Sequence, residues 1–434
     1  MMTLNSWLDL LERRHPQEIE LGLDRCGTVF KRLGSPKPAK KVFTVAGTNG
    51  KGSTVAYLSA ISGALGQRYG SYTSPHIFEF NERVCVLGEA VSDACLTDAF
   101  EQVETARGNV SLTYFEFTTL AALLILQQAG LDCAILEVGL GGRLDTVNLV
   151  DTDCAVITPI GLDHQDFLGP DLSSIATEKA GIIRPSANVV CTETSPPAPI
   201  RQTAEKLQSQ LYRRGHDFDL ISKPDAGGKI LQFSMAGQSI AVPYPPMDGD
   251  HQLDNLATAL AAMLLQNPAC ISKANEIGAA IQNCRLPGRL QIVQHAPEII
   301  LDVGHNQLAA EVVAAYLKTS NRVDVTCVLA MLADKPVEAV VLSLGDYCSR
   351  WICADSTGSR GQTAGLLAAR VKTALPAAEV NASGGLDDAM QLAISTVKED
   401  GTVLVFGSFT AVSGAAKWLQ NSLQHGDHDA ARIT

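Results

Sequence analysis

The sequence lacks any long apolar run and any excess of basic residues. Its 434 residues include 34 lysines and arginines against 46 aspartates and glutamates, a formal net charge of −12. The longest apolar runs, such as 120–126 and 259–265, fall well short of the ~18 residues that a membrane-spanning helix needs. We therefore expect no membrane span and no nucleic-acid partner bound through a general basic surface.

Paired cysteines are also missing. The eleven cysteines are odd in number and none forms a C-x-x-C pair, and several, such as Cys133, lie inside apolar stretches. This pattern is typical of reduced thiols packed in a core, and it predicts a cytoplasmic protein. The N-terminal residues show no basic stretch followed by an apolar core, so no secretion signal is predicted. With 46% apolar residues, the composition is that of a globular protein and excludes collagen, coiled coil and disorder.

Short apolar segments alternate with segments of helical spacing in the first two thirds of the chain. Strands are predicted at 42–46, 133–138 and 155–158, and helices at 53–65, 115–128, 173–180, 252–265 and 273–283. Strands that are apolar throughout are typical of a sheet buried on both faces. The pattern predicts an α/β fold with a doubly wound, mainly parallel sheet of the P-loop type. Residues 215–246, with short alternating pieces between glycines and prolines, predict a small antiparallel excursion.

A second α/β series follows the Pro287-Gly288 pair. Its strands are predicted at 298–303, 323–330, 350–353 and 402–406, and its helices at 308–317, 361–370, 386–397 and 410–419. We therefore expect two domains, residues 1–287 and a smaller Rossmann-like α/β domain of residues 288–434.

The strongest local signal is a glycine-rich loop between a buried strand and a helix. It reads Gly47, Thr48, Asn49, Gly50, Lys51, Gly52, Ser53, Thr54. Such a loop turns backbone N–H groups toward one point at a helix N-terminus, where phosphate binds. Lys51 would reach the β- and γ-phosphates, and Ser53 or Thr54 would offer a hydroxyl to Mg²⁺. The strict P-loop pattern fails because Gly52 separates Lys51 from Ser53, so a turn that only caps the helix is the alternative.

Several further motifs occur in order along the chain. These motifs are residues 72–76 (YTSPH), 81–84 (NERV), 136–145 (LEVGLGGRLD), 162–164 (LDH), 178–182 (EKAGI), 251–255 (HQLDN), 286–289 (LPGR), 302–306 (DVGHN) and 407–409 (GSF). Together with GTNGKGS at 47–53, the chain resembles the ATP-dependent amide-forming ligases that include the Mur ligases and, most closely, the bacterial bifunctional dihydrofolate synthases/folylpolyglutamate synthases. Two positions depart from that pattern: Gly304 stands where the family usually has alanine, and Pro336 where an acidic residue usually follows Lys335.

The resemblance implies a metal site for Mg²⁺, two ions being expected. Glu137 ends a predicted strand, where a carboxylate points into the ligand crevice of a parallel sheet. The resemblance adds His164, Ser53 and a carbamylated Lys179 as ligands. Taken alone, Glu137 could be a solvated strand-end acid, His164 a structural loop histidine and Lys179 a surface lysine.

Contacts to ATP and glutamate follow from the same resemblance. Gln252 and Asn255 share a helix face, and Asn255 is the better candidate for the adenosine side, although N-capping of the helix would also explain them. Arg289 is expected to contact the triphosphate. Asp302 and His305, which follow the predicted first strand of the second domain, would contact nucleotide and order the glutamate side, with Ser408 as a glutamate contact.

The folate end of the substrate is assigned to two segments. The loop of Ser74, Pro75 and His76, with Arg83, matches the loop that family members use at the pterin and acyl end. In the segment that contains Thr113 and Phe115, aromatic packing in the core is the plain interpretation, whereas the resemblance makes Phe115 a pterin contact. Asp145 would lie beside it.

These observations lead to one hypothesis and two alternatives. The hypothesis is a monomeric ligase that uses ATP to join L-glutamate to 7,8-dihydropteroate and to tetrahydrofolates through an acyl phosphate, with Lys51, Lys179, His164, Asp302 and His305 as catalytic residues. One alternative is a Mur-type ligase of cell-wall precursors; the phosphate loop begins at residue 47, however, which leaves little room for the N-terminal substrate domain of such enzymes. The other is a nucleotide-binding module without turnover.

Overall fold

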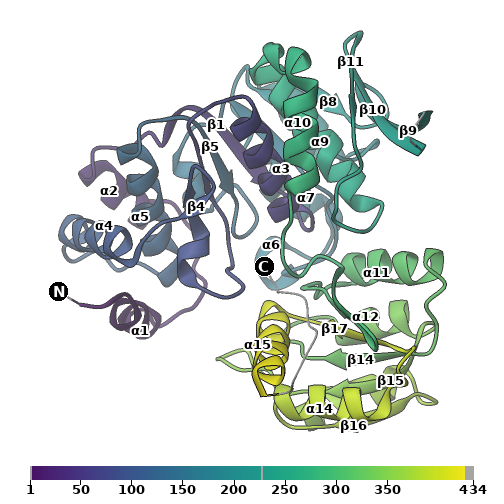
Figure 1. Cartoon of the computed structure of the whole chain (residues 1–434). Helices are drawn as coiled ribbons and strands as arrows, with labels where there is room; N and C mark the ends of the chain where they lie inside the picture. Colours follow the sequence, from purple (N-terminus) through teal and green to yellow (C-terminus); the bar gives the residue numbers. More distant parts are fainter. Residues whose placement is uncertain (1, 226–227, 426–434) are drawn as a thin grey trace. The chain divides into compact units, whose positions relative to one another are not determined.

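The computed structural model describes residues 2–225 and 228–425 and divides the chain into two compact units (Figure 1). The first unit comprises residues 1–160, 165–246 and 252–284, and the second comprises residues 161–164, 247–251 and 285–434. Each unit contains its own sheet. Across the residues that are described, none of the helices is both long and apolar enough to cross a membrane.

The first unit is built on a mainly parallel sheet of eight strands. The strands are β1 (Ala39–Ala46), β2 (Tyr69–Tyr72), β3 (Val84–Val86), β4 (Glu89–Ala90), β5 (Leu131–Glu137), β6 (Cys154–Ile157), β7 (Asn188–Cys191) and β8 (Gln210–Arg213). They lie in the order β4-β3-β2-β5-β1-β6-β7-β8, with only β3 and β4 antiparallel to their neighbours. The predicted strands of this domain are confirmed. Because β1 lies between β5 and β6, the loops that follow these three strands converge at one edge of the sheet.

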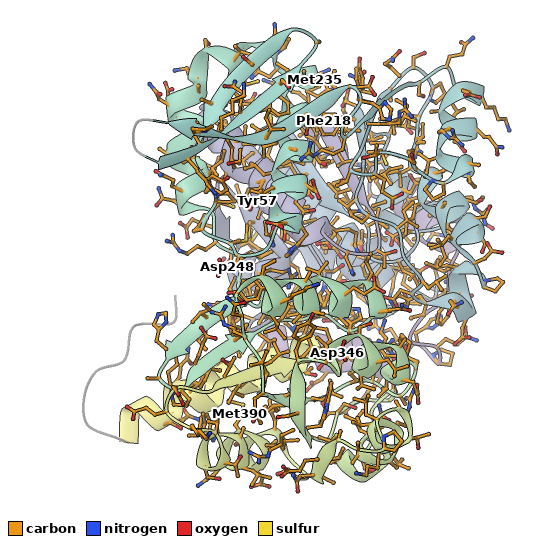
Figure 2. The ribbon with its side chains drawn as sticks, turned by 90° about the vertical axis from the view of Figure 1, so that its right-hand side faces the viewer. Tyr57, Phe218, Met235, Asp248, Asp346 and Met390 are labelled. Atoms are coloured by element: carbon orange, nitrogen blue, oxygen red, sulfur yellow. The ribbon has the colours of Figure 1, made fainter. Side chains whose placement is uncertain are left out.

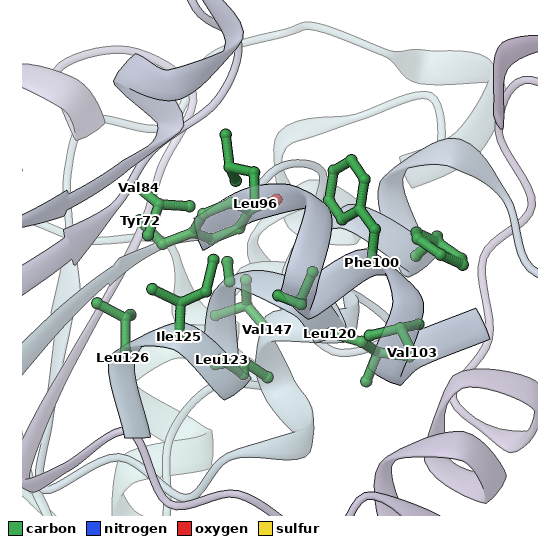
Figure 3. Close-up of a cluster of buried hydrophobic side chains, with 14 of the residues drawn as sticks. Tyr72, Val84, Leu96, Phe100, Val103, Leu120, Leu123, Ile125, Leu126 and Val147 are labelled. Carbon is green, nitrogen blue, oxygen red and sulfur yellow. The ribbon is translucent and has the colours of Figure 1, made fainter. Parts of the chain in front are cut away.

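Helices cover both faces of this sheet. Val42, Ala134 and Leu136 point to one face, where they form an apolar cluster with α1 (Leu4–Arg14), α2 (Asp24–Arg32), α4 (Asp93–Arg107) and α5 (Tyr114–Gln128). Figure 3 shows the part of this cluster that α4 and α5 contribute. Farther along this face, α7 (Leu172–Ala180) and α8 (Ala198–Lys206) pack over β6 and β7. Strand side chains alternate, so Val45 points to the opposite face. There α3 (Lys51–Ala64) packs on the sheet and α10 (Ala274–Asn283) packs on α3, with α9 (His251–Gln266) alongside (Figure 1).

The predicted antiparallel excursion is a separate three-stranded sheet. Its strands are β9 (Phe218–Asp225), β10 (Gly228–Met235) and β11 (Gln238–Val242), in the order β11-β10-β9. Met235 pairs with Phe218 across β10 and β9, and both side chains are buried (Figure 2). Residues 226 and 227 of the predicted segment lie outside the described residues.

The second unit contains a six-stranded sheet with five parallel strands. Its strands are β12 (Gln291–His295), β13 (Glu298–Leu301), β14 (Val325–Leu329), β15 (Cys348–Cys353), β16 (Glu379–Ala382) and β17 (Thr402–Phe406), in the order β12-β13-β17-β14-β15-β16. The helices are α11 (Gln307–Thr319), α12 (Val337–Leu344), α13 (Ala364–Ala374), α14 (Leu386–Thr396) and α15 (Phe409–His425). The α/β fold class predicted from the sequence is confirmed.

Two details of the second unit correct the sequence predictions. The strand predicted at 298–303 is not the first of its sheet, because β12 precedes it and pairs with it in antiparallel fashion. The helix predicted from residue 361 begins only at Ala364, after an N-cap by Thr363. The preceding Gln362 is held in a loop, where its side-chain amide donates to the carbonyl oxygens of Met331 and Leu332. All eleven cysteines are unpaired and nine are buried, which confirms the prediction of packed thiols.

Candidate active site

The glycine-rich loop follows β1 and leads into the first turn of α3. Gly50 caps the helix with a φ of 83°, a conformation that favours glycine, and a Cβ there would meet the Asn255 amide oxygen at 2.5 Å. The N–H of Thr48 donates to the carbonyl oxygen of Pro159, 2.8 Å away. Lys51 Nζ lies 3.3 Å from the carbonyl oxygen of Gly47 and 3.2 Å from that of Thr48, so its ammonium folds back over the loop. A helix N-terminus and an ammonium group thus converge on one point, as a phosphate site requires.

The two hydroxyl groups of the first turn differ in their contacts. Thr54 Oγ1 donates to the carbonyl oxygen of Gly50 over 2.9 Å, which commits its proton to the helix backbone. Ser53 is 2% exposed and stands one residue closer to the loop. Of the two, Ser53 is the better placed oxygen donor for a cation beside a bound phosphate.

Lys179 is buried, so its interpretation as a surface lysine is wrong. Its side chain comes from the last turn of α7 and only 3% of the residue is exposed. Lys179 Nζ donates to the carbonyl oxygen of Gly47 at 2.8 Å. The helix is fixed at this end by the Arg143–Glu178 ion pair and by close packing at Gly142, where a Cβ would meet the carbonyl oxygen of Glu178 at 2.8 Å. Lys179 therefore lies against the phosphate loop.

Glu137 is also buried, with 6% exposed, and it is not the solvated strand-end acid that the sequence alone allows. It is the last residue of β5 and pairs in register with Val45 of β1, two residues before Gly47. Its Oε2 accepts a hydrogen bond from the backbone N–H of Ser74, 3.3 Å away. This contact places the start of the predicted substrate loop beside the predicted metal carboxylate.

Asp145 and Phe115 lie next to the glycine-rich segment after β5. Asp145 accepts from the N–H groups of Leu140 and Val147, at 2.8 and 2.9 Å. Burial raises the pKa of Asp145 to about 6, although those N–H groups and the charge of Lys51 act in the opposite direction. The ring of Phe115 packs against Gly139, where a Cβ would come within 2.5 Å of it. Thr113 caps α5 by accepting from the N–H of Glu116, so it has a structural task there.

Arg83 lies in a cage of aromatic rings directly before β3. Only 8% of Arg83 is exposed, and its guanidinium lies 5.2 Å from the ring centre of Phe80 and 5.5 Å from that of Tyr114. Arg83 Nε lies 3.0 Å from His76 Nδ1, within hydrogen-bonding distance. Arg83 and His76 are therefore in contact, whereas Pro75 beside them is exposed.

In the second unit, Asp163 gathers a polar cluster that the sequence did not reveal. Its Oδ1 accepts from Lys335 Nζ at 2.7 Å and its Oδ2 from the Asn306 side-chain amide at 3.0 Å, and His305 Nε2 lies 3.6 Å from Oδ2. Lys335 Nζ is also 3.3 Å from His164 Nε2. Hydrogen bonding to His305 and the charges of His305 and Lys335 hold the pKa of Asp163 well below its usual range, against the effect of burial. No signal in sequence spacing links residues 163 and 335.

A second group in this unit surrounds the end of β13. Asp302 is 8% exposed and accepts from the N–H groups of Leu290 and Gly304; burial raises its pKa, opposed mainly by the charge of Arg289. The Arg289 guanidinium lies 5.5 Å from the ring centre of Phe409.

His251 and Ser408 complete the residues of the second unit that the motifs single out. Burial, with the charge of Arg289, lowers the pKa of His251 to about 4, so its imidazole is neutral at pH 7. Ser408 accepts from the N–H of Ala411 at the start of α15, so it too has a structural contact.

The predicted site residues thus fall into two groups. Asn255, with Gln252 3.3 Å from its amide nitrogen, joins the first unit beside Gly50, together with Lys51, Ser53, Glu137 and Lys179. His164, Arg289, Asp302, His305 and Ser408 belong to the second unit. In the described parts of the chain, no group of three or more His, Cys, Asp or Glu side chains is arranged to hold a metal ion. The predicted metal ligands are Ser53, Glu137, His164 and a carbamylated Lys179. They include only two residues of the His, Cys, Asp and Glu types, so they are not a group of that kind.

Two family models match the chain. Residues 45–263 match the Mur ligase middle domain and residues 288–409 match the Mur ligase glutamate ligase domain. The first match contains the phosphate loop, Glu137 and Lys179, and the second contains Arg289, Asp302 and Ser408.

Individual relatives match nearly the whole chain. The dihydrofolate synthase/folylpolyglutamate synthase of Escherichia coli strain K12 is 41% identical over 411 residues, 94% of each chain. The structure titled E. coli FolC in complex with DHPP and ADP has a TM-score of 0.89 at 39% identity and covers 97% of this chain and 98% of its own.

A bifunctional folylpolyglutamate synthase/dihydrofolate synthase from Yersinia pestis, complexed with AMPPNP and Mn ion, has a TM-score of 0.87 at 39% identity, over 97% of this chain and 98% of its own. A structure of such an enzyme with Mn, AMPPNP and L-glutamate bound has a TM-score of 0.86 at 38% identity, with the same coverage. The chain belongs to the dihydrofolate synthase/folylpolyglutamate synthase family of Mur-type ligases.

Proposed function

We propose that this chain is an ATP-dependent ligase that joins L-glutamate to 7,8-dihydropteroate and to tetrahydrofolates. The observation that carries the proposal is the contact between Ser74 N–H and Glu137 Oε2, because it joins the substrate loop to a buried carboxylate whose partner on β1, Val45, stands two residues before the phosphate loop. Relatives with this name, and solved structures with ADP, DHPP, Mn and glutamate, support it. The Mur-type substrate and the module without turnover have no comparable support.

The reaction requires activation of a carboxylate. The folate carboxylate attacks the γ-phosphorus of ATP, which forms an acyl phosphate and releases ADP. The amino group of glutamate then attacks the acyl carbon and loses a proton to solvent, and phosphate leaves with the bonding electrons of the C–O bond. Such transfers depend on positioning and on charge neutralisation more than on covalent chemistry by the protein. Lys51 would neutralise the γ-phosphate, and Arg289 with Asp302 and His305 would serve the nucleotide and glutamate side.

The buried donors of the first unit fit a divalent cation. Ser53, in the first turn of α3, and Glu137, at the end of β5, are buried oxygen donors, which suits Mg²⁺, and bound Mg²⁺ would neutralise phosphate charge. Lys179 as an ammonium cannot be a ligand, whereas a carbamate at Nζ supplies carboxylate-like oxygens at the same place. His164 Nε2 faces Lys335 in the second unit, so as a ligand it would have to exchange that partner. The count of two ions and the carbamate belong to the proposal.

The remaining assignments are substrate contacts and cellular context. Asn255 would meet the adenosine, Ser408 the glutamate, and the Ser74–His76 loop with Arg83, Thr113, Phe115 and Asp145 the pterin and acyl end. We assign residues 1–287 to the ATP-binding domain and 288–434 to the glutamate-ligase domain. We expect the protein to be a monomer. We also expect it in the cytoplasm, because its cysteines are unpaired.

The test is glutamate-dependent release of ADP. Protein with Mg-ATP, 7,8-dihydropteroate and glutamate should release ADP and form dihydrofolate, and tetrahydrofolate should acquire further glutamates. Lys51→Ala should lower kcat/KM by about 100-fold or more because a phosphate donor is lost, while Lys40→Ala, at an exposed lysine, should be unchanged. Absence of ADP release with both folate substrates would refute the proposed function.

A further inference from the structure

In the loop between β2 and the short helix η1 (Phe80–Arg83), the part next to η1 is held by the carboxylate of Glu82. Glu82 Oε2 accepts from the N–H of Ile77 at 2.9 Å, and Glu82 Oε1 accepts from the N–H groups of Phe78 and Glu79 at 2.9 and 2.8 Å. Three successive backbone donors therefore converge on one side chain. Hydrogen bonds to an ionised acceptor are about twice as strong as neutral ones.

Glu82 itself is held from several directions. Its own N–H donates to the carbonyl oxygen of Glu79, and its carbonyl oxygen accepts from Thr73 Oγ1 at 3.5 Å. The neighbouring Asn81 side-chain amide donates to the carbonyl oxygen of Val91 and to Asp93 Oδ1, at 2.7 and 2.9 Å. The segment that contains Glu82 is thus hydrogen-bonded to residues that follow the edge strand β4, and the backbone of residues 77–79 is in turn hydrogen-bonded to Glu82.

The segment fixed in this way carries the substrate-loop residues. Ser74, Pro75 and His76 lie between two attachments: Ser74 N–H on Glu137 at one end, and Ile77 N–H on Glu82 at the other. His76 is additionally in contact with Arg83, the residue after Glu82. Without the carboxylate, three backbone donors would lose their acceptor, and two of these hydrogen bonds, from Ile77 and Phe78, are partly buried.

We propose that Glu82 is a positioning residue for the folate substrate, which presents the 74–79 loop in its binding conformation. This inference rests on the proposed function, since it names the substrate that the loop serves. Glu82 touches no reacting atom in this scheme; it acts through the backbone of residues 77–79. The substitution Glu82→Gln keeps the shape but replaces one acceptor oxygen with a donor that faces a backbone N–H.

The test compares Glu82→Gln with Glu89→Gln, which removes the same charge from an exposed position on β4. For Glu82→Gln we expect KM for dihydropteroate and tetrahydrofolate to rise about tenfold or more, because charge-assisted bonds of this kind contribute about that factor or more to an equilibrium constant. KM for ATP and for glutamate should stay within about twofold, since the phosphate loop keeps its contacts. A merely structural role would change all three KM values together, and either that result or an unchanged folate KM would overturn the proposal.

Hydrogen exchange gives a measurement that does not depend on activity, and its wild-type part does not require the variant to fold. In the wild-type protein the amides of Ile77, Phe78 and Glu79 should exchange slowly, and in Glu82→Gln faster. Unprotected amides in the wild type would overturn the inference even if Glu82→Gln failed to fold. An inactive wild-type protein with protected amides would instead refute the proposed function and leave Glu82 as an anchor of the loop only, which also removes its assignment to folate.

Discussion

The ammonium nitrogen of Lys179 lies 2.8 Å from the carbonyl oxygen of Gly47, the first residue of the phosphate loop. A lysine that is 3% exposed is costly to keep charged unless it has a partner. A carbamate at Nζ would turn the cation into an anion while one N–H remains to donate to Gly47. The contact therefore suits both states of the side chain.

Lys179→Ala should lower kcat by about 100-fold, in line with the loss of a group that supports a metal site. In the wild type, ¹³C-labelled bicarbonate should give a carbamate carbon resonance in NMR spectra that the variant lacks. Lys40→Ala, at a lysine whose side chain is 78% exposed, is the control for loss of one positive charge. Full activity of Lys179→Ala would exclude the proposed role, and a missing resonance in the wild type would exclude the carbamate.

Asp145 should make the protein less stable as the pH rises from about 4 to about 6. Its pKa in the folded state is about 6, above the ordinary value of 3.8, so the folded state binds the proton more tightly than the unfolded state. Stability from the neutral form is complete below the ordinary pKa and is lost as the pH rises through about 6. Two pKa units correspond to about 3 kcal/mol at most.

The measurement is the melting temperature of wild type and Asp145→Asn between about pH 4 and pH 7. The asparagine cannot ionise, so the melting temperature of the variant should rise relative to wild type by a few degrees across this range. Loss of the acceptor for Leu140 N–H adds a constant offset that does not depend on pH. Asp9→Asn, at an exposed aspartate, is the control for the loss of one carboxylate. A constant difference for Asp145→Asn would contradict the raised pKa.

How much the sequence could predict depended on whether the signal was local. Apolar strands such as β1 and β5 and the glycine-rich loop are local patterns, and the structure has them at those positions. The position of Glu137 at the end of β5 could be predicted because a strand end is a local pattern too. By contrast, β12 and β16 are short, half-exposed strands on sheet edges, where little apolar burial marks the sequence.

The burial of Lys179 and the cluster at Asp163 could not have been predicted from spacing. Lys179 meets a carbonyl group 132 positions away, and Lys335 meets Asp163 at a separation of 172. Contacts at such separations are set by how the strands are ordered in each sheet, which a single sequence does not encode in its periodicity. From the sequence, Glu82 could be recognised only as a member of the motif at 81–84. Its three partners are backbone N–H groups, which every residue except proline has, so the sequence does not mark them.

Gly304, which departs from the family pattern, should not tolerate the alanine that is usual there. A Cβ at this position would lie 2.6 Å from Phe406 Cε2 and 2.7 Å from the Cβ of Ala309. Phe406 is fully buried, so its ring has little room to move. Overpacking of this kind costs about 1–3 kcal/mol, so Gly304→Ala should lower the melting temperature by several degrees.

The source of that clash can be checked with a smaller side chain at position 406. In a Phe406→Val background the space of the ring is partly vacated, so the added methyl of Gly304→Ala should cost less or nothing. The double-mutant cycle should therefore show a favourable coupling between the two substitutions. Additive effects would mean that Ala309 or the backbone, and not Phe406, excludes the methyl group.

Removal of one partner from the buried ion pair of Asp163 and Lys335 should destabilise the protein far more than removal of one partner from a surface pair. Their side chains are 8% and 5% exposed. Lys335→Met would leave the Asp163 carboxylate buried without its ammonium partner, which costs about 3–5 kcal/mol. Lys40→Met, which breaks the exposed pair with Asp132, should cost about 1 kcal/mol or less. Melting temperatures of the two variants give the comparison.

The difference in stability between the wild type and a double variant, Asp163→Asn/Lys335→Met, should shrink as the pH falls below the usual pKa of an aspartate. The pKa of Asp163 lies below its usual range, so its stabilising contribution is present above the usual pKa and is lost as the pH falls toward the folded-state value. The double variant removes both charges together and should be more stable than Lys335→Met alone, because no uncompensated charge remains. If the double variant is instead the less stable of the two, the cost comes from the other contacts of the carboxylate, with Asn306, His305 and the N–H of His164, and not from an unpaired charge.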